Sequence, residues 1–276
     1  MNIAVLGAGI SGLGSAYLLS KKHTVDIYEK EHRLGGHART TFVEEGNKKL
    51  GVDTGFLVFN HPTYPLLTKL FEQLDVKIEN TDMSFAFWQK DENIVYNGSS
   101  LPGMFCQKRN LFRPSHYIMI NDILKFNKKA KSDLEENSSD LNKTLGEYVK
   151  DYSSYFKTRY ILPMGGAIWS TSTEEMNKFP AKTFVQFFKN HGLLGVDTHH
   201  QWLTVSGGSI NYVEKISKQI SGEIFLNSDI KKIKRVDNKV VLIDSNNNEK
   251  IYDKIVLAMH APDALNMLED ASDDEK

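Results

Sequence analysis

The sequence predicts an α/β fold, and three observations lead to this prediction. Residues 2–6 form a short apolar run, which is typical of a strand buried on both faces. A glycine-rich turn follows at residues 7–12, and a helical pattern and a second strand complete a compact βαβ unit by residue 29. Strand-like segments return after residue 222. We therefore expect a Rossmann-like domain that is interrupted by an inserted α+β domain.

The interruption divides the chain into two expected domains. A discontinuous domain that contains the βαβ unit and would bind a cofactor is expected over residues 1–80 and 205–276, and a substrate or cap domain over residues 81–204. The length of 276 residues suits one large domain or two entangled ones. The chain is 40% hydrophobic and 25% charged, which is the composition of a globular protein and not of a disordered one.

The remaining elements follow from periodicity and from turn residues. Apolar side chains along one side predict a helix over residues 62–74, with Pro62 near its start. Two apolar runs at 85–88 and 94–96 flank a polar turn and predict a hairpin. Residues 127–143 are rich in charged and polar side chains, which indicates a solvated helix and loop. The second half of the chain adds an expected helix over 209–220 and expected strands over 223–226, 230–236, 239–244 and 254–258.

Charge and cysteine content exclude several classes of function. The 34 basic and 35 acidic side chains give a net charge of −1, which gives no support to binding of nucleic acid or steering to anionic membranes. The single cysteine, Cys106, excludes an internal disulfide and a cysteine-based metal site. The reducing cytoplasm is therefore the simplest location. No apolar run approaches the roughly 20 residues of a transmembrane helix, and the N-terminus lacks the basic region of a signal peptide.

The strongest local signal is the glycine pattern at residues 7–12. Gly7 permits a tight turn, Gly9 has no Cβ to keep a pyrophosphate from the backbone, and Gly12 lets the next helix pack close to the sheet. The N-terminus of that helix offers free N–H groups and a partial positive charge to phosphates. The expected binding turn consists of Gly7, Ala8, Gly9, Ile10, Ser11 and Gly12.

Two features further along the chain favour one dinucleotide over the others. Glu29 closes the second strand, where its carboxylate can accept both ribose hydroxyls of an adenosine and would repel the 2′-phosphate of NADP. Gly35 and Gly36 form a second glycine pair, which the simple NAD pattern lacks and which allows the backbone to approach a second stretch of the dinucleotide. Arg33, just before this pair, can contact phosphate. The sequence therefore predicts FAD as the cofactor.

Several segments resemble known flavoproteins. In order and spacing, GAGISG (7–12), YEK (28–30) and RLGGHART (33–40) resemble the N-terminal FAD pattern of the flavin-containing amine oxidase superfamily, whose members usually have Arg where this chain has His37. A narrower resemblance is to the bacterial predicted NAD/FAD-binding proteins associated with cyclopropane-fatty-acid synthases, and to the flavin domain fused to the plant synthases. It is carried by residues 52–65, 160–194, 202–213 and 253–265.

The resemblance implies a role for each residue that matches the pattern. Residues 33–37 would face the phosphate–ribityl region, and residues 53–56 would lie near the ribityl chain and the isoalloxazine. Ile230 would meet the adenine through its backbone, and Ala258 would lie near the cofactor at the end of a strand. No catalytic side chain is assigned. Beyond the first turn, the implied cofactor-binding residues are Glu29, Lys30, Arg33, Leu34, Gly35, Gly36, His37, Thr40, Asp53, Thr54, Gly55, Phe56, Ile230 and Ala258.

Members of the superfamily continue beyond the position of Lys276. Their C-terminal segment has its own glycine-rich FAD motif, helps to close the flavin site and completes the substrate domain. The resemblance therefore implies either that this sequence is a fragment or that it is a natural short form with an incomplete flavin site.

Three other patterns have structural explanations. His199 and His200 are adjacent, so their side chains diverge, and no carboxylate stands at ligand spacing; no metal site is expected. Residues 170–173 precede two glutamates and are expected to cap a helix, because the chain has neither a Ser–His–Asp pattern nor a G-x-S-x-G turn. Trp169 and the pair at 187–188 are expected in a core, with contact to an acyl chain or flavin as the alternative.

The leading functional hypothesis is an FAD-dependent oxidoreductase. The flavin would abstract a hydride from a carbon of a small-molecule or lipid-derived substrate, and the protein would supply position and electrostatics. An amine is the usual substrate of the superfamily, and a lipid acyl chain is what the narrower resemblance implies. The first alternative is a non-catalytic FAD- or nucleotide-binding module or an incomplete fragment. An NAD-dependent dehydrogenase is a further alternative, with less support from the sequence.

Overall fold

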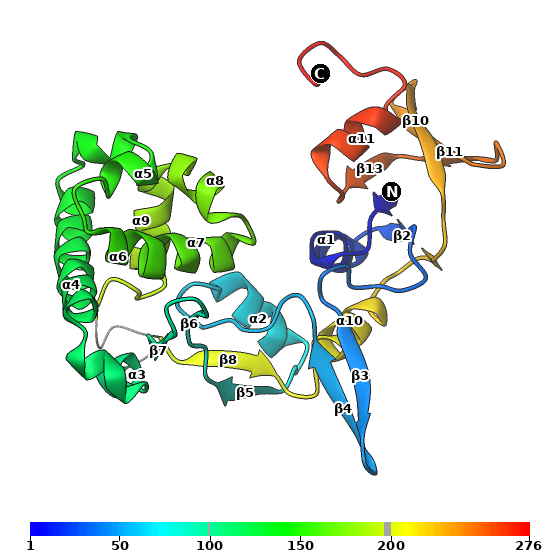
Figure 1. The fold of residues 1–276 in the computed structure, drawn as a ribbon. Coiled ribbons are helices and arrows are strands. Elements are labelled where there is room, and N and C mark those ends of the chain that lie inside the picture. The colour runs from blue at the N-terminus through cyan, green and yellow to red at the C-terminus, as the bar shows by residue number, and fades with distance from the viewer. Residues whose placement is uncertain (99, 196–199) are drawn as a thin grey trace. The chain divides into compact units, whose positions relative to one another are not determined.

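The chain folds as two compact units, and each collects segments that are distant in sequence. The computed structural model describes residues 1–98, 100–195 and 200–276. The first unit contains Met1–Phe59, Tyr64–Asn80 and Leu203–Lys276, and the second contains Asn60–Thr63 and Thr81–Trp202. Helices and a parallel sheet occur together, so the predicted α/β class is confirmed (Figure 1). The assignment of one unit to the cofactor and of the other to the substrate stays a prediction.

A four-stranded parallel sheet organises the first unit. Its strand order is β13 (Lys254–Leu257), β1 (Asn2–Leu6), β2 (Thr24–Tyr28) and β9 (Ile224–Phe225). The two central strands are buried along most of their length, which explains why short apolar runs without alternation predicted them. β9 pairs with β2 over two residues only and is shorter than the expected strand over 223–226.

Helices cover one face of this sheet. α1 (Ile10–Ser20) follows β1, and α10 (Ile210–Ser217) lies next to α1 (Figure 1). Because successive side chains of a strand point to opposite faces, every second residue of β1 and β2 reaches this layer. The contact is apolar and fully buried at its centre, and it includes Ile3, Val5, Val25, Ile27, Leu13, Ala16, Val213 and Ile216.

An antiparallel meander covers the opposite face. It consists of β10 (Ile230–Val236), β11 (Lys239–Asp244) and β12 (Glu249–Tyr252), and α11 (Ala261–Met267) follows β13. The predicted turn between β10 and β11 is confirmed, with positive φ at both of its residues. The alternate side chains of the sheet pack here, as Ala4, Leu6, Tyr28, Ile233, Val240, Leu242 and Tyr252.

The first unit also contains a hairpin that the sequence did not predict. β3 (Thr40–Glu45) pairs with β4 (Lys48–Asp53) as a separate two-stranded sheet. Phe42 and Val43 are adjacent, and both are about half exposed, at 49% and 48%. Because apolar residues lie on both faces of this hairpin, its strands lack the alternation of apolar and polar residues by which a half-buried strand is recognised.

The expected helix over 62–74 begins later than predicted. α2 spans Pro65–Gln73, and Pro65 instead of Pro62 occupies its first turn. The side chain of Asn60 accepts hydrogen bonds from the backbone N–H and the hydroxyl of Thr63, which closes a turn before the helix. Farther along, β5 (Ile78–Thr81) pairs with β8 (Trp202–Val205).

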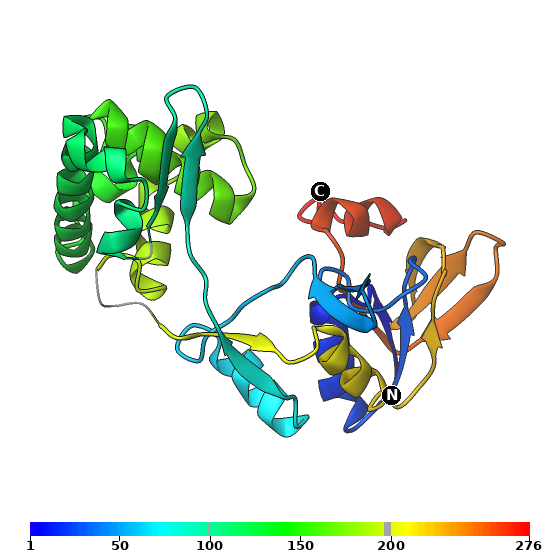
Figure 2. The ribbon, with the colours of Figure 1, turned by 60° about the horizontal axis from the view of Figure 1, so that its bottom comes forward.

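The second unit combines one hairpin with many short helices. The predicted hairpin is confirmed as β6 (Ala86–Gln89) and β7 (Ile94–Asn97), and Figure 2 shows it beside the green helices of this unit. The helical segments are α3 (Leu101–Met104), the 3₁₀ turn η1 (Lys108–Phe112), α4 (Pro114–Glu135), the 3₁₀ turn η2 (Ser139–Asn142), α5 (Leu145–Tyr148), α6 (Ser154–Phe156), the π turn η3 (Lys157–Ile161), α7 (Leu162–Trp169), α8 (Thr173–Lys178) and α9 (Ala181–Asn190).

Aromatic side chains build the core of the second unit. Phe126, Phe156, Phe184 and Phe188 are fully buried, and Trp169 packs against Phe184 with ring centroids 5.5 Å apart. Within the expected cap at 170–173, the hydroxyl of Ser172 accepts the N–H of Glu175 at 3.1 Å, which confirms a helix cap. Among the helices that the structure describes, none has the length and hydropathy needed to span a bilayer.

A polar network ties the meander to the central strand β2 of the parallel sheet. The carboxylate of Asp26 in β2 accepts hydrogen bonds from the hydroxyl of Tyr252 at 2.7 Å and from the ammonium of Lys250 at 2.9 Å. The backbone N–H of Glu223 donates to the same carboxylate at 2.9 Å. Burial raises the pKa of Asp26, but these three hydrogen bonds outweigh it and hold the pKa below its usual value of 3.8.

We expect Asp26 to make the stability of the fold sensitive to acid. A carboxyl group with a lowered pKa stabilises the fold above its unfolded pKa, and the stabilisation is lost as the pH falls through the folded pKa. The free energy of unfolding should therefore decrease as the pH is lowered below about 4. Asp26→Asn should weaken this pH dependence and lower the free energy of unfolding by about 1–3 kcal/mol at pH 7. Denaturant titrations at several pH values measure both effects. Asp91→Asn, in an exposed turn, is the control; equal slopes for Asp26→Asn and the wild type would contradict the prediction.

Candidate functional site

The turn after β1 is packed so closely that two of its glycines have no substitute. Gly7 has a φ of +96°, and a Cβ on it would lie 2.6 Å from the carbonyl oxygen of Ala258. A Cβ on Gly12 would lie 1.8 Å from the carbonyl oxygen of Gly7 and 3.3 Å from the Cβ of Ala258. Ala258, the first residue after β13, therefore lies directly against the turn, and its expected place near the cofactor stays a prediction.

Gly9 differs from its two neighbours in the pattern, because the fold itself does not need a glycine there. Its φ of −69° is allowed for any residue, and among the described residues no atom lies within 4 Å of a Cβ built on it. The open space lies in front of the first turn of α1. The remaining reason for a glycine at this position is that a ligand approaches its backbone.

The start of α1 supplies donors to that space. Gly9 is the N-cap residue, no side chain in the described part of the chain caps it, and the first turn contains no acidic residue. The first N–H groups of a helix have no partner within the helix, and they carry a partial positive charge. An uncapped helix start beside an open space at Gly9 fits a pyrophosphate, which brings acceptors and negative charge.

The second glycine pair packs backbone to backbone against this turn. The N–H of Gly35 donates to the carbonyl of Ala8 at 2.8 Å, and a Cβ on Gly36 would lie 3.0 Å from the Cα of Gly9. The guanidinium of Arg33 donates to the carbonyls of Gly36, at 3.0 Å, and of Leu34, at 3.3 Å. Arg33 thus holds the loop in shape, and its expected contact with phosphate stays a prediction.

Glu29 joins the end of β2 to the glycine turn. Its side chain is buried, one carboxylate oxygen accepts the N–H of Ala8 at 2.7 Å, and the other accepts the N–H of Glu31 at 2.9 Å. The N–H of Ser228 donates to the Glu29 carbonyl at 2.8 Å, so the segment that leads into Ile230 lies at the same strand end. A carboxylate oxygen accepts more than one hydrogen bond, so both oxygens retain capacity for ribose hydroxyls.

A third segment continues the line of backbone contacts. The N–H of Phe56 donates to the carbonyl of His37 at 3.3 Å, and a Cβ on Gly55 would lie 2.2 Å from that same oxygen. The N–H of Thr54 donates to the carbonyl of Arg39 at 2.9 Å. The structure thus brings residues 53–56 beside residues 37–39, although the hairpin β3–β4 separates them in sequence.

Asp53 and Thr40 have partners in the helix layer. The carboxylate of Asp53 accepts the N–H of Ser209 at 2.9 Å and its hydroxyl at 2.8 Å, and the hydroxyl of Thr40 donates to it at 2.5 Å. The N–H of Ile210 donates to the hydroxyl of Thr40 at 3.0 Å. The two side chains therefore satisfy the start of α10 and fix it to the hairpin. Sequence reasoning missed this role, for which the sequence offers one signal, the pair Gly207 and Gly208 directly before Ser209.

Burial raises the pKa of one tyrosine next to the clamp, the name we give to the hydrogen bonds of Asp53 and Thr40 with the start of α10. Tyr212 lies in α10, is almost fully buried, and packs against Phe71 with ring centroids 5.0 Å apart. Burial raises the pKa of its hydroxyl to about 12, and a hydrogen bond with Ser209 lowers it by less. Tyr212 therefore stays neutral and supports packing around neutral pH.

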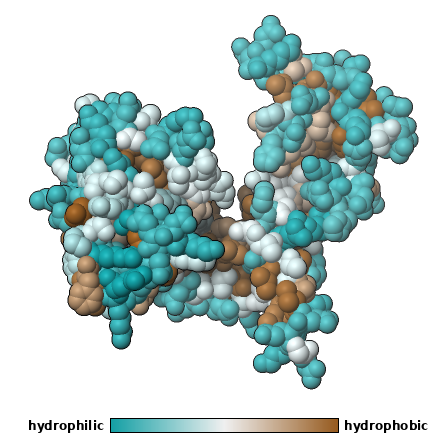
Figure 3. All heavy atoms as spheres, in the orientation of Figure 1, coloured by the Kyte–Doolittle hydropathy of each residue, from teal (hydrophilic) through white to brown (hydrophobic). Residues whose placement is uncertain are grey.

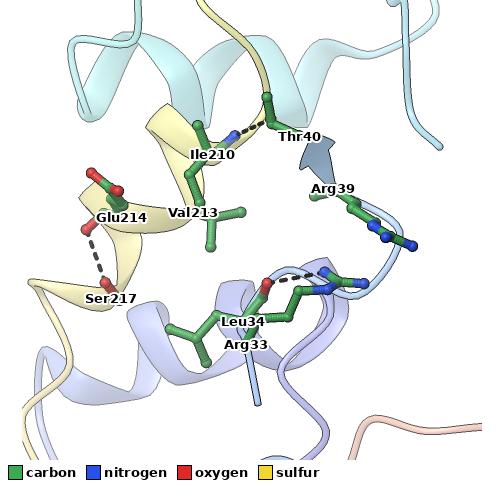
Figure 4. A pocket seen from close by; sticks show the side chains of 9 residues that line it. Arg33, Leu34, Arg39, Thr40, Ile210, Val213, Glu214 and Ser217 are labelled. Atoms are coloured by element: carbon green, nitrogen blue, oxygen red, sulfur yellow. Dashed lines mark hydrogen bonds between the residues drawn. The ribbon is translucent and has the colours of Figure 1, made fainter. Parts of the chain in front are cut away.

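A small cavity lies between the second glycine loop and α10. Its volume is about 190 Å³, below the range of roughly 300–1,000 Å³ that ligand pockets usually have. Figure 4 shows the side chain of Arg39 directed away from the other lining residues. Gly9 and Glu29 are not part of its wall, so it is separate from the open space in front of α1. The lining residues are Arg33, Leu34, Ala38, Arg39, Thr40, Ile210, Val213, Glu214 and Ser217.

The remaining predicted features concern two exposed side chains and the histidine pair. Lys30 and His37 are exposed. Within the described ranges, no three His, Cys, Asp or Glu side chains gather in a way that could hold a metal ion. His199 lies outside the described residues, and a ring nitrogen of His200 is 3.2 Å from the carbonyl oxygen of Asn190.

The sequence matches the family described as flavin-containing amine oxidoreductase over residues 10–272. Solved structures with a similar fold include a putrescine oxidase redesigned in its cofactor binding, at 15% identity and a TM-score of 0.71. A fatty acid isomerase from P. acnes that produces CLA matches at 17% identity and a TM-score of 0.66. An oxidoreductase from Methanosarcina mazei matches at 17% identity and a TM-score of 0.64.

These similarities cover nearly all of this chain but only part of each structure. The match to the putrescine oxidase covers 99% of this chain and 61% of that one. The corresponding values are 99% and 62% for the isomerase and 100% and 63% for the Methanosarcina protein. The chain thus spans about three fifths of the length of the structures it resembles.

Proposed function

Because the chain belongs to the flavin-containing amine oxidoreductase family, with FAD as its cofactor, we propose that it uses FAD to oxidise a carbon–hydrogen bond of its substrate. The observation that supports this most is Gly9, a glycine that neither its backbone angles nor its described neighbours require. Gly9 is the N-cap of α1, and the start of this helix would offer hydrogen-bond donors and positive charge to a diphosphate.

We propose that the cofactor lies along segments of the first unit that contact one another through their backbones. The turn at 7–12 would hold the diphosphate, and the carboxylate of Glu29 would accept the ribose hydroxyls. The segment before Ile230 lies at the same strand end, where the adenine is expected. Residues 35–37 and 53–56 continue from the turn toward the expected ribityl chain. Arg33 and the clamp of Asp53 with Thr40 would act indirectly, by holding these backbones in place.

Bound FAD supplies a two-electron oxidation, so the chain itself needs no nucleophile for that chemistry. The tasks left to the protein are to bind and orient the cofactor and substrate and to keep water from the reacting carbon. We assign cofactor binding to the domain over 1–80 and 205–276, and we propose that residues 81–204 bind or cap the substrate.

Two substrate classes follow from different observations. A putrescine oxidase is among the similar structures, and an amine is the usual substrate in the superfamily. A fatty acid isomerase is also among them, and the segments at 160–194 and 253–265 resemble proteins associated with cyclopropane-fatty-acid synthases. We therefore propose an amine or a lipid acyl chain as the substrate.

The role of the glycine turn can be tested without any substrate. Gly9→Ala should leave the thermal unfolding temperature nearly unchanged, because the added methyl group meets no described protein atom within 4 Å. The same methyl group should obstruct the diphosphate and weaken binding of FAD by at least about tenfold. Titration of the apoprotein with FAD, followed by flavin fluorescence, measures the affinity.

Gly14→Ala is the matched control, because Gly14 lies in the same helix and its added methyl group also meets no described atom within 4 Å. This variant should bind FAD as tightly as the wild type. Equal FAD affinity in Gly9→Ala and Gly14→Ala would show that the space in front of Gly9 does not receive the cofactor.

The reaction class is tested by mixing the FAD-loaded protein anaerobically with candidate substrates. Loss of the yellow absorbance with a short diamine, or with a fatty acyl compound, would identify the class that donates the electrons. A chemical reductant serves as the positive control for bleaching. If the reductant bleaches the flavin and neither class does, the chain is a non-catalytic FAD-binding module, which is the competing hypothesis.

A further inference from the structure

One corner of the second unit exposes large apolar side chains. They lie on α3, on the 3₁₀ turn η1 and on the first half of α4, and we call them the α3–α4 surface. Figure 3 shows apolar atoms beside hydrophilic ones at the end of the unit that holds α3. The members, with their exposed fractions, are Leu101 (65%), Leu111 (46%), Phe112 (86%), Tyr117 (48%), Ile118 (45%) and Leu124 (53%).

The core of the unit does not need these side chains. α4 buries a different face, on which Met119, Phe126 and Ala130 are fully buried. Tyr117 and Leu124 are seven residues apart and so share one face of the helix, together with Lys128. Tyr117 packs against Phe105 with ring centroids 5.6 Å apart, but the core of the unit includes none of the members of this surface, so their exposed apolar area remains in contact with water.

Hydrogen bonds on both sides of Leu111 and Phe112 fix the backbone that carries these two exposed side chains. Asn110 is fully buried, and its side-chain amide donates to the carbonyl of Val95 at 2.9 Å. On the other side of Leu111 and Phe112, the guanidinium of Arg113 donates to the carbonyl of Glu92 at 3.0 Å. Both anchors reach the β6–β7 hairpin, so the two apolar side chains between them are presented by a fixed backbone.

The elements that carry this surface are basic, which the balanced charge of the whole chain conceals. Residues 101–132 contain seven basic side chains and a single acidic one, Asp122. Two of the lysines in the second half of α4, Lys125 and Lys129, pair with Asp122, Asp133 and Asp140. Asp122 is buried and accepts the N–H of Ser153 at 3.0 Å. Within the part of the chain that the structure describes, no carboxylate forms an ion pair with Lys108, Arg109 or Lys128.

We propose that the α3–α4 surface docks the protein on an anionic lipid surface. Exposed Phe and Leu side chains enter the boundary between headgroups and acyl chains, and unpaired Lys and Arg side chains beside them face the headgroup phosphates. Phe112 and Leu111 are the inserting residues, and Lys108 and Arg109 are the cations of the same 3₁₀ turn. The docking is independent of the substrate proposed above, because it involves neither the cofactor nor a reacting group.

The experiment is flotation of the full chain with vesicles of phosphatidylcholine, with and without phosphatidylglycerol. The wild type should bind the anionic vesicles and bind the neutral ones more weakly, and added salt should weaken the difference. Lys108→Gln combined with Arg109→Gln should reduce the affinity for anionic vesicles by about tenfold or more. Leu111→Ser combined with Phe112→Ser should reduce it to a similar extent.

Matched controls lie on the first unit. Leu66→Ser replaces an apolar side chain that is 82% exposed, and Lys48→Gln with Lys49→Gln removes two exposed cations of the β3–β4 hairpin. These variants should bind anionic vesicles like the wild type, and all variants should keep the wild-type circular dichroism spectrum. The proposal is overturned if the wild type does not bind anionic vesicles, if the surface variants bind as well as the controls, or if the surface binds an oligonucleotide but no vesicle.

Discussion

The candidate site depends on the direct contact of two glycine-rich turns through their backbones. Gly35 donates its N–H to Ala8, and Gly36 lies so close to Gly9 that a Cβ would be only 3.0 Å from the Cα of Gly9. This contact leaves the start of α1 open on the side of Gly9. Larger residues at these positions would either separate the turns or fill the space that a dinucleotide needs.

The rest of the first unit holds these turns in place. The parallel sheet is covered by helices on one face and by the meander on the other. Because its strands are parallel, the carboxyl ends of β1, β2 and β13 meet at one edge. The carboxylate of Glu29 then holds the first turn through the N–H of Ala8, and Asp53 holds α10. Rigid positioning of backbone donors is what electrostatic binding of a diphosphate requires.

Local features could be predicted from the sequence, and contacts between distant residues could not. The strands β1 and β2, the glycine turn and the position of Glu29 lie within 29 residues and follow from periodicity and turn chemistry. The link from Asp53 to Ser209 joins residues 156 positions apart, which no pattern reveals. The β3–β4 hairpin has no single apolar face, and the balanced charge of the whole chain concealed the basic segment at 101–132. The individual cofactor contacts stay predictions.

The most direct test of whether the glycine turn binds a flavin is to identify the molecule that the purified protein carries. Denaturation of the protein followed by chromatography of the released compound gives that identity and the amount per chain. We expect FAD, at about one molecule per chain after incubation with excess FAD and removal of the free cofactor. Retention of NAD in place of FAD, or a folded protein that retains no dinucleotide after the same treatment, would contradict the assignment.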